Sequence, residues 1–149
     1  MEWLVKKYEE LTKDELYNII KERVDVFVVE QQCPYPEIDG RDKESYHFFA
    51  LDKDNIIVYL RILEPGISFK EASIGRVLVN KIYRRQGIGK EIIKRAIDFI
   101  TNKLGYNIIR ISAQEYLLDF YTELGFSKVS DVYLEDGIPH IEMVFENIK

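Results

Sequence analysis

One long amphipathic helix, with a β-rich segment directly before it, constrains the fold of this chain more than any other feature. Between residues 87 and 104 apolar side chains recur at helical spacing and form one stripe: Ile88, Ile92, Ile93, Ala96, Ile100 and Leu104. Gly105 follows this stripe at the position where helices commonly end. Residues 73–79 have the composition of a strand. A strand, a turn and an amphipathic helix in this order predict helices packed on a β-sheet.

The other elements follow from the same two periodicities. Thr12 is a predicted helix N-cap, and Glu15 completes a capping box for a first helix that runs to residue 28. Strands are predicted at 3–8, 47–51, 56–63, 73–79, 107–112, 129–134 and 140–145, a short helix at 117–124, and a proline-containing loop at 33–43. The expected order is β-α-β-β-β-α-β-α-β-β, which predicts a mixed sheet of the α/β (α+β) class.

The composition is that of a globular protein and argues against several function classes. At 149 residues, with 46% apolar and 32% charged residues, we expect one domain spanning residues 1–149. No stretch reaches the roughly 18 apolar residues that cross a membrane, and the N-terminus lacks the apolar core of a signal peptide. Cys33 is the only cysteine, which excludes an internal disulfide and suits a cytoplasmic location. A net charge of −5 argues against general binding of nucleic acid.

Positive charge gathers where the long helix is predicted to begin. This point is flanked by four basic residues: Lys81, Arg84, Arg85 and Lys90. A helix N-terminus already carries partial positive charge, so further cations there are unfavourable unless an anion neutralises them. Gly87 and Gly89 lack a Cβ atom, which lets the backbone close on a bound phosphate. The pattern favours a phosphate site over a solvated basic turn whose glycines only ease the connection.

The same segment resembles a known protein family. The Q/R-x-x-G-x-G/A motif of the GNAT N-acetyltransferases is matched by Arg84-Arg85-Gln86-Gly87-Ile88-Gly89. A second GNAT element, FY-x-x-x-GF, is matched by residues 120–126, and residues 27–31, 33–35, 38–40 and 136–140 resemble the ElaA-like branch of the family. The resemblance covers nearly the whole chain. It implies a GNAT-like mixed, mostly antiparallel central sheet flanked by helices.

The resemblance also implies a cofactor, acetyl-coenzyme A (acetyl-CoA), as the acyl donor. In GNAT proteins the backbone amides of the motif hold the pyrophosphate, and the strand before it pairs with the pantetheine arm. The residues that this implies for cofactor binding are Leu78, Val79, Arg84, Arg85, Gln86, Gly87, Ile88, Gly89, Lys90, Gln114 and Tyr121. Two histidines and one cysteine make a metal site improbable, so no metal is expected.

Acetyl transfer from a thioester to an amine needs a donor for the developing oxyanion, an acid and a base. The resemblance implies that a backbone N–H at about Leu78 or Val79 binds the thioester carbonyl. It also implies that Tyr121 protonates the departing thiolate, since a phenol can supply a proton when it is held within reach. The alternative role for Tyr121 is packing between the last helix and the sheet.

Three residues are candidates for the base that takes a proton from the acceptor amine. His140 lies at the start of the last strand, and histidine is the residue type most often used as a general base; its alternative role is to cap the turn at 136–137. Glu30 follows the apolar run 26–29 and could face the same channel; its alternatives are a surface carboxylate or an ion pair with Arg23. His47 lies at a strand start and is more typical of a structural residue.

The expected activity is acetyl-CoA-dependent transfer to a primary amine of a small molecule or peptide. Asp39 and Asp42, with Glu30, predict an acidic rim for a cationic acceptor, while Arg76 either binds a substrate anion or pairs with a carboxylate. Two alternatives stay open: a non-catalytic acyl-CoA sensor or interaction module, and an enzyme like the acyl-homoserine-lactone synthases. No nucleic-acid or membrane partner is expected. Dimers are common among GNAT relatives, so a homodimer is an open alternative to a monomer.

Overall fold

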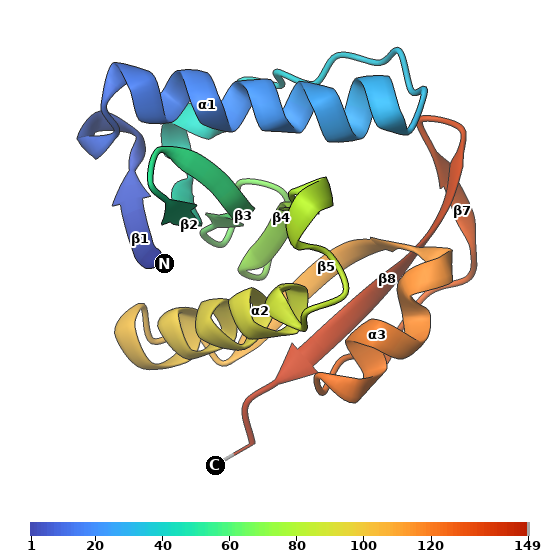
Figure 1. Ribbon diagram of the computed structural model, residues 1–149. Helices are drawn as coiled ribbons and strands as arrows, with labels where there is room; N and C mark the ends of the chain where they lie inside the picture. Colours follow the sequence, from blue (N-terminus) through green and yellow to red (C-terminus); the bar gives the residue numbers. More distant parts are fainter. Residues whose placement is uncertain (149) are drawn as a thin grey trace.

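The computed structural model describes residues 1–148, and its strands form two sheets that meet near the middle of the molecule (Figure 1). The first sheet has the order β1-β2-β3-β4, and the second has the order β5-β8-β6 with β7 paired to β8. Every pair within the two sheets is antiparallel. The strands are β1 (Glu2–Lys7), β2 (Tyr46–Asp52), β3 (Asn55–Leu63), β4 (Ser73–Val79), β5 (Ile108–Gln114), β6 (Ser127–Lys128), β7 (Tyr133–Glu135) and β8 (Ile138–Glu146).

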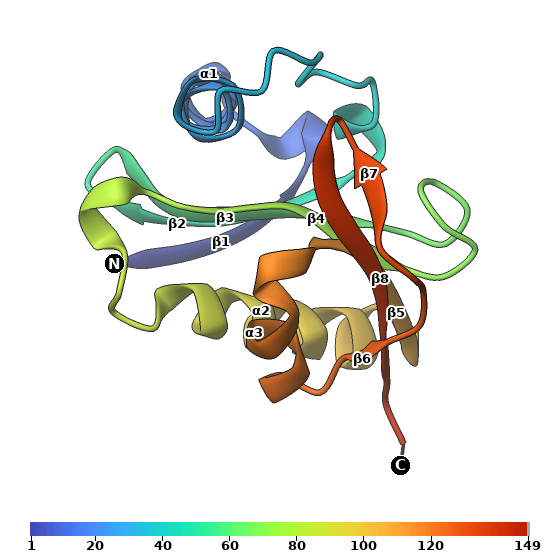
Figure 2. The same ribbon diagram turned by 90° about the vertical axis from the view of Figure 1, so that its right-hand side faces the viewer.

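Three α-helices cover these sheets. They are α1 (Lys13–Arg23), α2 (Ile88–Asp98) and α3 (Leu118–Glu123); α1 continues as a π-helical segment over Val24–Glu30, and α2 over Phe99–Lys103. Short 3-10 turns lie at Tyr8–Glu10, Asp42–Glu44, Lys81–Tyr83 and Glu115–Leu117. Figure 2 shows α1 on one face of the first sheet and α2 and α3 on the opposite side. Within residues 1–148, no helix combines the length and the hydropathy that a membrane span requires.

The predicted order of elements is confirmed as far as α3, as are its local signals. Thr12 caps α1 through its side chain, with Glu15 completing the capping box, and Gly105 ends the second helix with φ +81°. The single strand predicted at 129–134 is wrong, because β6 ends before this range and β7 begins only at Tyr133. The break has a local cause: the hydroxyl of Ser130 accepts the N–H of Glu142 on β8 at 2.8 Å, in place of a backbone carbonyl.

The two sheets separate between β4 and β5. Ala72 and Ile109 form one isolated parallel bridge, and the N–H of Arg110 donates to the Ala72 carbonyl at 2.8 Å. Beyond this point the two strands run apart, as Figures 1 and 2 both show. One edge of β4 therefore faces open space over the rest of its length, and its backbone groups on that side have no neighbouring strand.

Apolar side chains fill both faces of the first sheet. The larger cluster lies under α2, whose stripe is almost fully buried: Ile88, Ile92, Ile93, Ala96 and Ile100. The smaller cluster lies under α1 and includes Ile19, Phe49, Tyr59 and Leu78. Burying these two stripes fixes both helices against the sheet.

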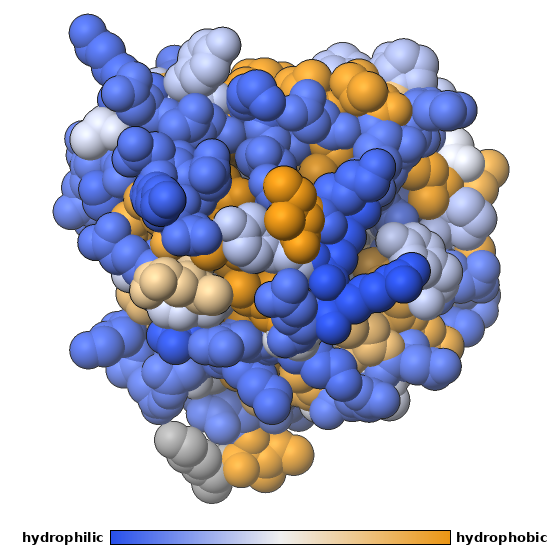
Figure 3. Space-filling model, viewed as in Figure 1, coloured by the Kyte–Doolittle hydropathy of each residue, from blue (hydrophilic) through white to orange (hydrophobic). Residues whose placement is uncertain are grey.

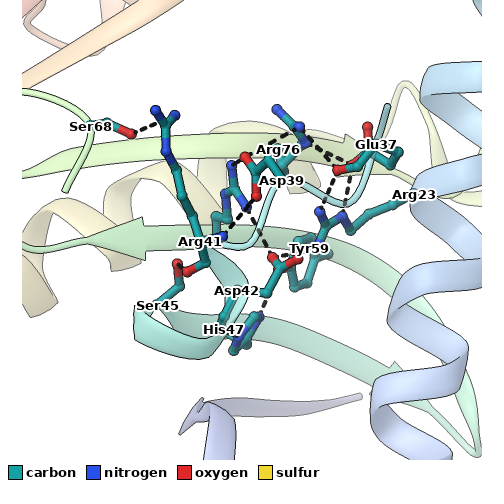
Figure 4. A network of polar contacts seen from close by, with 11 residues as sticks. Arg23, Glu37, Asp39, Arg41, Asp42, Ser45, His47, Tyr59, Ser68 and Arg76 are labelled. Carbon is teal, nitrogen blue, oxygen red and sulfur yellow. Dashed lines mark hydrogen bonds and ion pairs between the residues drawn. The ribbon is translucent and has the colours of Figure 1, made fainter. Parts of the chain in front are cut away.

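A charged core lies beside the smaller cluster, between α1, the 37–42 loop and the sheet (Figure 4). Arg23 of α1 is 0% exposed, and its Nη1 donates to Asp42 Oδ1 at 2.6 Å. Asp42 Oδ1 also accepts from Arg61 Nη1 at 3.0 Å. Below it, His47 Nε2 meets the Asp42 carbonyl oxygen at 2.9 Å and Nδ1 meets the Tyr59 hydroxyl at 2.7 Å. Since a carbonyl only accepts, Nε2 of His47 carries the proton, and Nδ1 accepts from the phenol.

We expect Gly125→Ala to destabilise the fold more than Gly105→Ala. Both glycines follow a helix and have positive φ, +101° and +81°, so each alanine is strained by about 1 kcal/mol. Only at Gly125 would the added Cβ lie 3.0 Å from the Phe145 ring, while at Gly105 it meets nothing within 4 Å. The contact adds about 1–3 kcal/mol. Urea unfolding of the two variants measures the difference, and equal losses would contradict the predicted contact.

We also expect an acid-sensitive stability term from His47. Burial lowers the pKa of its imidazole below the ordinary value. The unfolded chain therefore binds more protons below about pH 6.5, and the free energy of unfolding falls as the pH drops through that value. His47→Gln keeps a donor and an acceptor at this position. Between about pH 7.5 and about pH 5.5, its free energy of unfolding should fall by about 1 kcal/mol less than that of the wild type. Urea unfolding at the two pH values checks this, and parallel losses would contradict it.

Candidate active site

The separation of β4 and β5 creates the main cleft of the molecule. Its two walls are residues 74–77 of β4 and 111–114 of β5. The segment 27–37 after α1 and the turn between β7 and β8 close the cleft on either side, and Tyr121 of α3 also lines it. The cleft thus joins elements from both halves of the chain around the open edge of β4.

Two backbone amides of β4 point toward this open side. In a paired strand, N–H groups alternate between facing the neighbouring strand and facing away from it. The N–H of Asn80 donates to a β3 carbonyl at 2.7 Å, so that of Leu78, two residues back, faces β3 as well. The N–H groups of Val77 and Val79 therefore face away from β3. The carbonyl of Val79 has the same direction, since it accepts from Arg84 Nε at 2.9 Å.

The two β4 residues expected to bind the cofactor, Leu78 and Val79, lie in different surroundings. Leu78 lines neither the cleft nor the groove beside the motif; it is 3% exposed and packs under α1. Val79 lies in the groove beside the motif, and Val77 lies in the cleft. Sequence analysis placed Val77 in the strand expected along the pantetheine arm but not among the individual binding residues, because the direction of an amide depends on which neighbour the strand pairs with.

The motif residues form a second, shallower groove where α2 begins. Gly87 has φ +78° and occupies the N-cap position without a side chain to accept from the first amides. The helical ladder starts with the N–H of Glu91, which donates to the Gly87 carbonyl at 3.2 Å. The amides of residues 88–90 precede this bond, so they are oriented donors at a positively polarised helix end. The groove is lined by Val79, Arg84, Arg85, Gly87, Ile88, Gly89, Lys90 and Phe120, and hydrophilic side chains gather on the surface over this loop (Figure 3).

Two of the basic side chains at this site already have carboxylate partners. Arg84 binds Glu30 in a two-point contact, Nη1 to Oε2 at 2.6 Å and Nη2 to Oε1 at 2.8 Å. Lys90 Nζ donates to Glu123 at 2.5 Å. The protein itself therefore neutralises part of the charge that the sequence analysis assigned to an external anion. The uncapped amides of residues 88–90 are the firmer indication of an anion site.

Glu30 lies beside the motif and not beside Arg23. The predicted ion pair between Glu30 and Arg23 is wrong, because Arg23 turns into the charged core and binds Glu37 and Asp42. The hydrogen bonds from Arg84 lower the pKa of Glu30, which keeps it ionised and occupied. A carboxylate held in this way is a weak base, so the structure favours a role for Glu30 in positioning Arg84.

Tyr121 projects from α3 into a buried aromatic group and reaches the cleft. Its ring packs edge-on against Phe120 and Phe126, at centroid distances of 5.0 and 5.6 Å. The residue is 6% exposed, and burial raises the pKa of its phenol. The hydroxyl is therefore a proton donor at neutral pH. The packing role is confirmed, since Tyr121 belongs to the core cluster; the residue also lines the cleft, and its role as an acid stays a prediction.

His140 of β8 lines the same cleft with a fixed tautomer. Its Nδ1 lies 2.7 Å from the Ile138 carbonyl oxygen, which can only accept, so Nδ1 carries the proton. Nε2 of the neutral ring is then an acceptor, 3.6 Å from a carboxylate oxygen of Glu135. On the neighbouring strand β5, Gln114 stands opposite His140, and its Nε2 donates to Gln31 at 3.4 Å across the cleft. An imidazole with a free ring nitrogen is suited to accept a proton.

The predicted acidic rim of Asp39 and Asp42 is wrong. Both carboxylates belong to the charged core, where Asp39 binds Arg61 through two oxygens and Asp42 binds Arg23 and Arg61. Burial acts to raise the pKa of Asp39, but hydrogen bonds from Arg61 and from a backbone N–H outweigh it and hold the pKa below its ordinary value. The carboxylate of Glu135, half exposed at the cleft, is placed where the rim was expected.

Sequence analysis missed several polar residues of the cleft, among them Gln31, Glu37 and Glu135. Glu37 lies in the segment interpreted only as a loop, and it binds Arg76, which is 39 residues away in the chain. Of the two roles considered for Arg76, pairing with a carboxylate is confirmed. A glutamate directly after Pro36 in a loop was the available signal, but no spacing rule connects it to its partner.

Comparison with known proteins identifies the family. A family model described as an acetyltransferase (GNAT) domain matches residues 9–147. The chain is 36% identical to protein ElaA of Escherichia coli, covering 100% of this chain and 99% of ElaA, and 37% identical to the UPF0039 protein sll0451 of Synechocystis, covering 96% and 94%. A crystal structure of an acyl-CoA N-acyltransferase from Pseudomonas aeruginosa is 38% identical and superposes with a TM-score of 0.91, covering 97% of this chain and 98% of that one.

These matches agree with the two motifs, the order of elements and the separation of β4 and β5. They extend over almost the whole chain at identities that establish common descent. This protein is therefore a member of the GNAT acetyltransferase family, in its ElaA-like branch, and an acyltransferase.

Proposed function

We propose that this protein transfers the acetyl group of acetyl-CoA directly to a primary amine of a small molecule or peptide. One observation carries the proposal: a single cleft joins the exposed amides of β4 to Tyr121 and His140, and the groove with the uncapped amides of α2 begins at Val79 on the same strand. An anion-binding end, a row of backbone donors and two proton-transfer groups are what a thioester with a nucleotide tail requires.

The residues present fit such a cofactor. The amides of residues 88–90, with Gly87 closing the turn, would hold the pyrophosphate, and the free edge of β4 would pair with the amide groups of the pantetheine arm. Arg85, exposed at the groove, supplies positive charge. The cofactor would supply the activated thioester, and the protein would orient that thioester in the cleft.

Three groups of the protein would then have separate roles in the transfer. The N–H of Val77 faces the cleft, where it would donate to the thioester carbonyl as negative charge develops on its oxygen. His140 Nε2, unprotonated in the neutral ring, would take a proton from the acceptor amine. Tyr121, kept protonated by burial, would supply a proton to the departing sulfur. Water is excluded on the floor of the site by the aromatic packing around Tyr121.

Acetyl transfer with an amine panel and detection of the released thiol tests this function. The proposal expects saturable, amine-dependent release of CoA from acetyl-CoA, with an acetylated product identified by mass spectrometry. Saturable binding of acetyl-CoA without transfer to any amine would favour the sensor that the sequence analysis left open. Arg84→Ala is the control for cofactor binding alone, because the Arg84 side chain lines the groove of the motif and lies outside the main cleft.

Tyr121→Phe should lower kcat by about 10²-fold while binding acetyl-CoA with nearly wild-type affinity. The substitution removes only the hydroxyl, so the packing against Phe120 and Phe126 is kept. Steady-state kinetics together with calorimetry of acetyl-CoA binding separate the two effects. Transfer at the wild-type rate would remove the proposed acid role of Tyr121.

His140→Gln should lower kcat by about 10²- to 10³-fold while binding acetyl-CoA with nearly wild-type affinity. Glutamine keeps a polar side chain at the cleft but cannot take a proton from the acceptor amine. The measurement is steady-state kinetics with one acceptor, together with calorimetry of acetyl-CoA binding. Transfer at the wild-type rate in the variant would assign the base to another residue.

A further inference from the structure

Arg76 is in a strained conformation inside β4. Its φ is +52°, in the left-handed region that disfavours residues with a Cβ atom, and it is the one non-glycine residue among those described in 1–148 that adopts positive φ within a strand. The register of β3 and β4 slips at the same place, since Tyr59 pairs with Leu78 whereas Arg61 pairs with Gly75. One residue of β3 therefore opposes two of β4, which defines a β-bulge.

Buried charges hold this bulge through its own side chain. Arg76 Nε donates to Glu37 Oε2 at 2.7 Å, and Nη2 donates to the Glu37 carbonyl at 3.1 Å. The same carboxylate oxygen accepts from Arg23 Nε at 2.9 Å, and the side chains of Glu37 and Arg23 are 9% and 1% exposed. Arg23 is fixed in turn by Asp42 (Figure 4). A strained residue persists where surrounding contacts over-determine it, and these contacts do so.

The strain lies next to the reacting centre of the proposed function. Val77 follows Arg76 directly, and its N–H faces the cleft instead of β3. A bulge bends a strand and redirects the groups beside it. If the bulge relaxed to regular pairing, every group of β4 on one side of it would shift by one position and change direction.

We propose that Arg23, Glu37 and Arg76 form a brace that holds the bulge of β4 and so aims the Val77 N–H at the thioester carbonyl. These three are positioning residues, and the inference rests on the acetyl transfer proposed above. Arg76 acts through the backbone, although it also lines the cleft. A direct contact of its guanidinium with the acceptor is the competing role.

A pair of variants at one position separates the two roles. Arg76→Ala and Arg76→Gly both remove the guanidinium and leave Glu37 with the same remaining partner, Arg23. Glycine adopts a φ of +52° without a steric cost, whereas alanine does not. We expect kcat of Arg76→Ala to fall by about 10- to 100-fold with the affinity for CoA within about threefold of wild type. Arg76→Gly should recover about tenfold of that loss.

Equal losses in kcat for the two variants would overturn the brace and assign Arg76 to the acceptor, and wild-type kcat in Arg76→Ala would overturn it as well. Urea unfolding of both variants shows whether their stabilities match. If either fails to fold, the wild type gives a second test. The ¹H–¹⁵N signal of Val77 should differ between the acetyl-CoA and CoA complexes, and that of Leu78 should not. Identical Val77 signals would overturn the proposal.

Assays of the wild-type protein distinguish failure of the brace from failure of the proposed function. Amine-dependent turnover by the wild type with equal effects of the two variants overturns the brace alone. Absence of turnover with every amine overturns the proposed function, and the Val77 comparison still decides where the β4 amide points.

Discussion

The structure depends on the limited backbone pairing between β4 and β5. Backbone N–H and C=O groups that are removed from water need partners, and a sheet normally supplies them along its whole length. Here Ala72 and Ile109 pair and the two strands then diverge, so part of β4 has donors without a neighbouring strand. A ligand with its own amide groups can take the place of that strand. The fold thus stays incomplete at the position where its substrate is expected.

Because β4 and β5 are kept apart, contacts other than strand pairing must hold the two sheets together. On one side, the stripe of α2 packs in a cluster that includes residues of both sheets, among them Ile62, Ile111 and Met143. On the other side, α1 is tied to the sheet by buried ion pairs as well as apolar contacts. A buried ion pair adds little net stability, because desolvation offsets its attraction, but breaking one is costly. Such contacts specify geometry, which suits a charged core beside a strained strand.

Periodicity and local motifs predicted most of the fold. The stripe from Ile88 to Leu104, the capping box at Thr12 and the glycine at 105 each depend on neighbours in sequence, and each is confirmed. The strand at 129–134 failed because the side chain of Ser130 took the place of a backbone acceptor, a substitution that β-propensity does not register. The motif also located the groove at α2, since a glycine turn before a helix is a local feature.

The charged residues could not be paired from the sequence. Helical spacing suggested Arg23 for Glu30, yet Glu30 binds Arg84, 54 residues later, and Arg23 binds Glu37 and Asp42. Ion pairs are decided by which chain segments meet in space, and one sequence does not contain that information. For the same reason the cleft residues His140 and Tyr121 were found through motif and position, whereas Glu37 and the direction of the Val77 N–H required the structure.

A crystal structure of the protein grown with CoA tests the central claim most directly. The account predicts the pyrophosphate on the amides of residues 88–90 and the pantetheine arm along the free edge of β4, between it and β5. CoA bound at another surface, with those amides free and the cleft empty, would contradict it. So would crystals that hold no CoA when it is supplied far above the concentrations at which acyltransferases bind it.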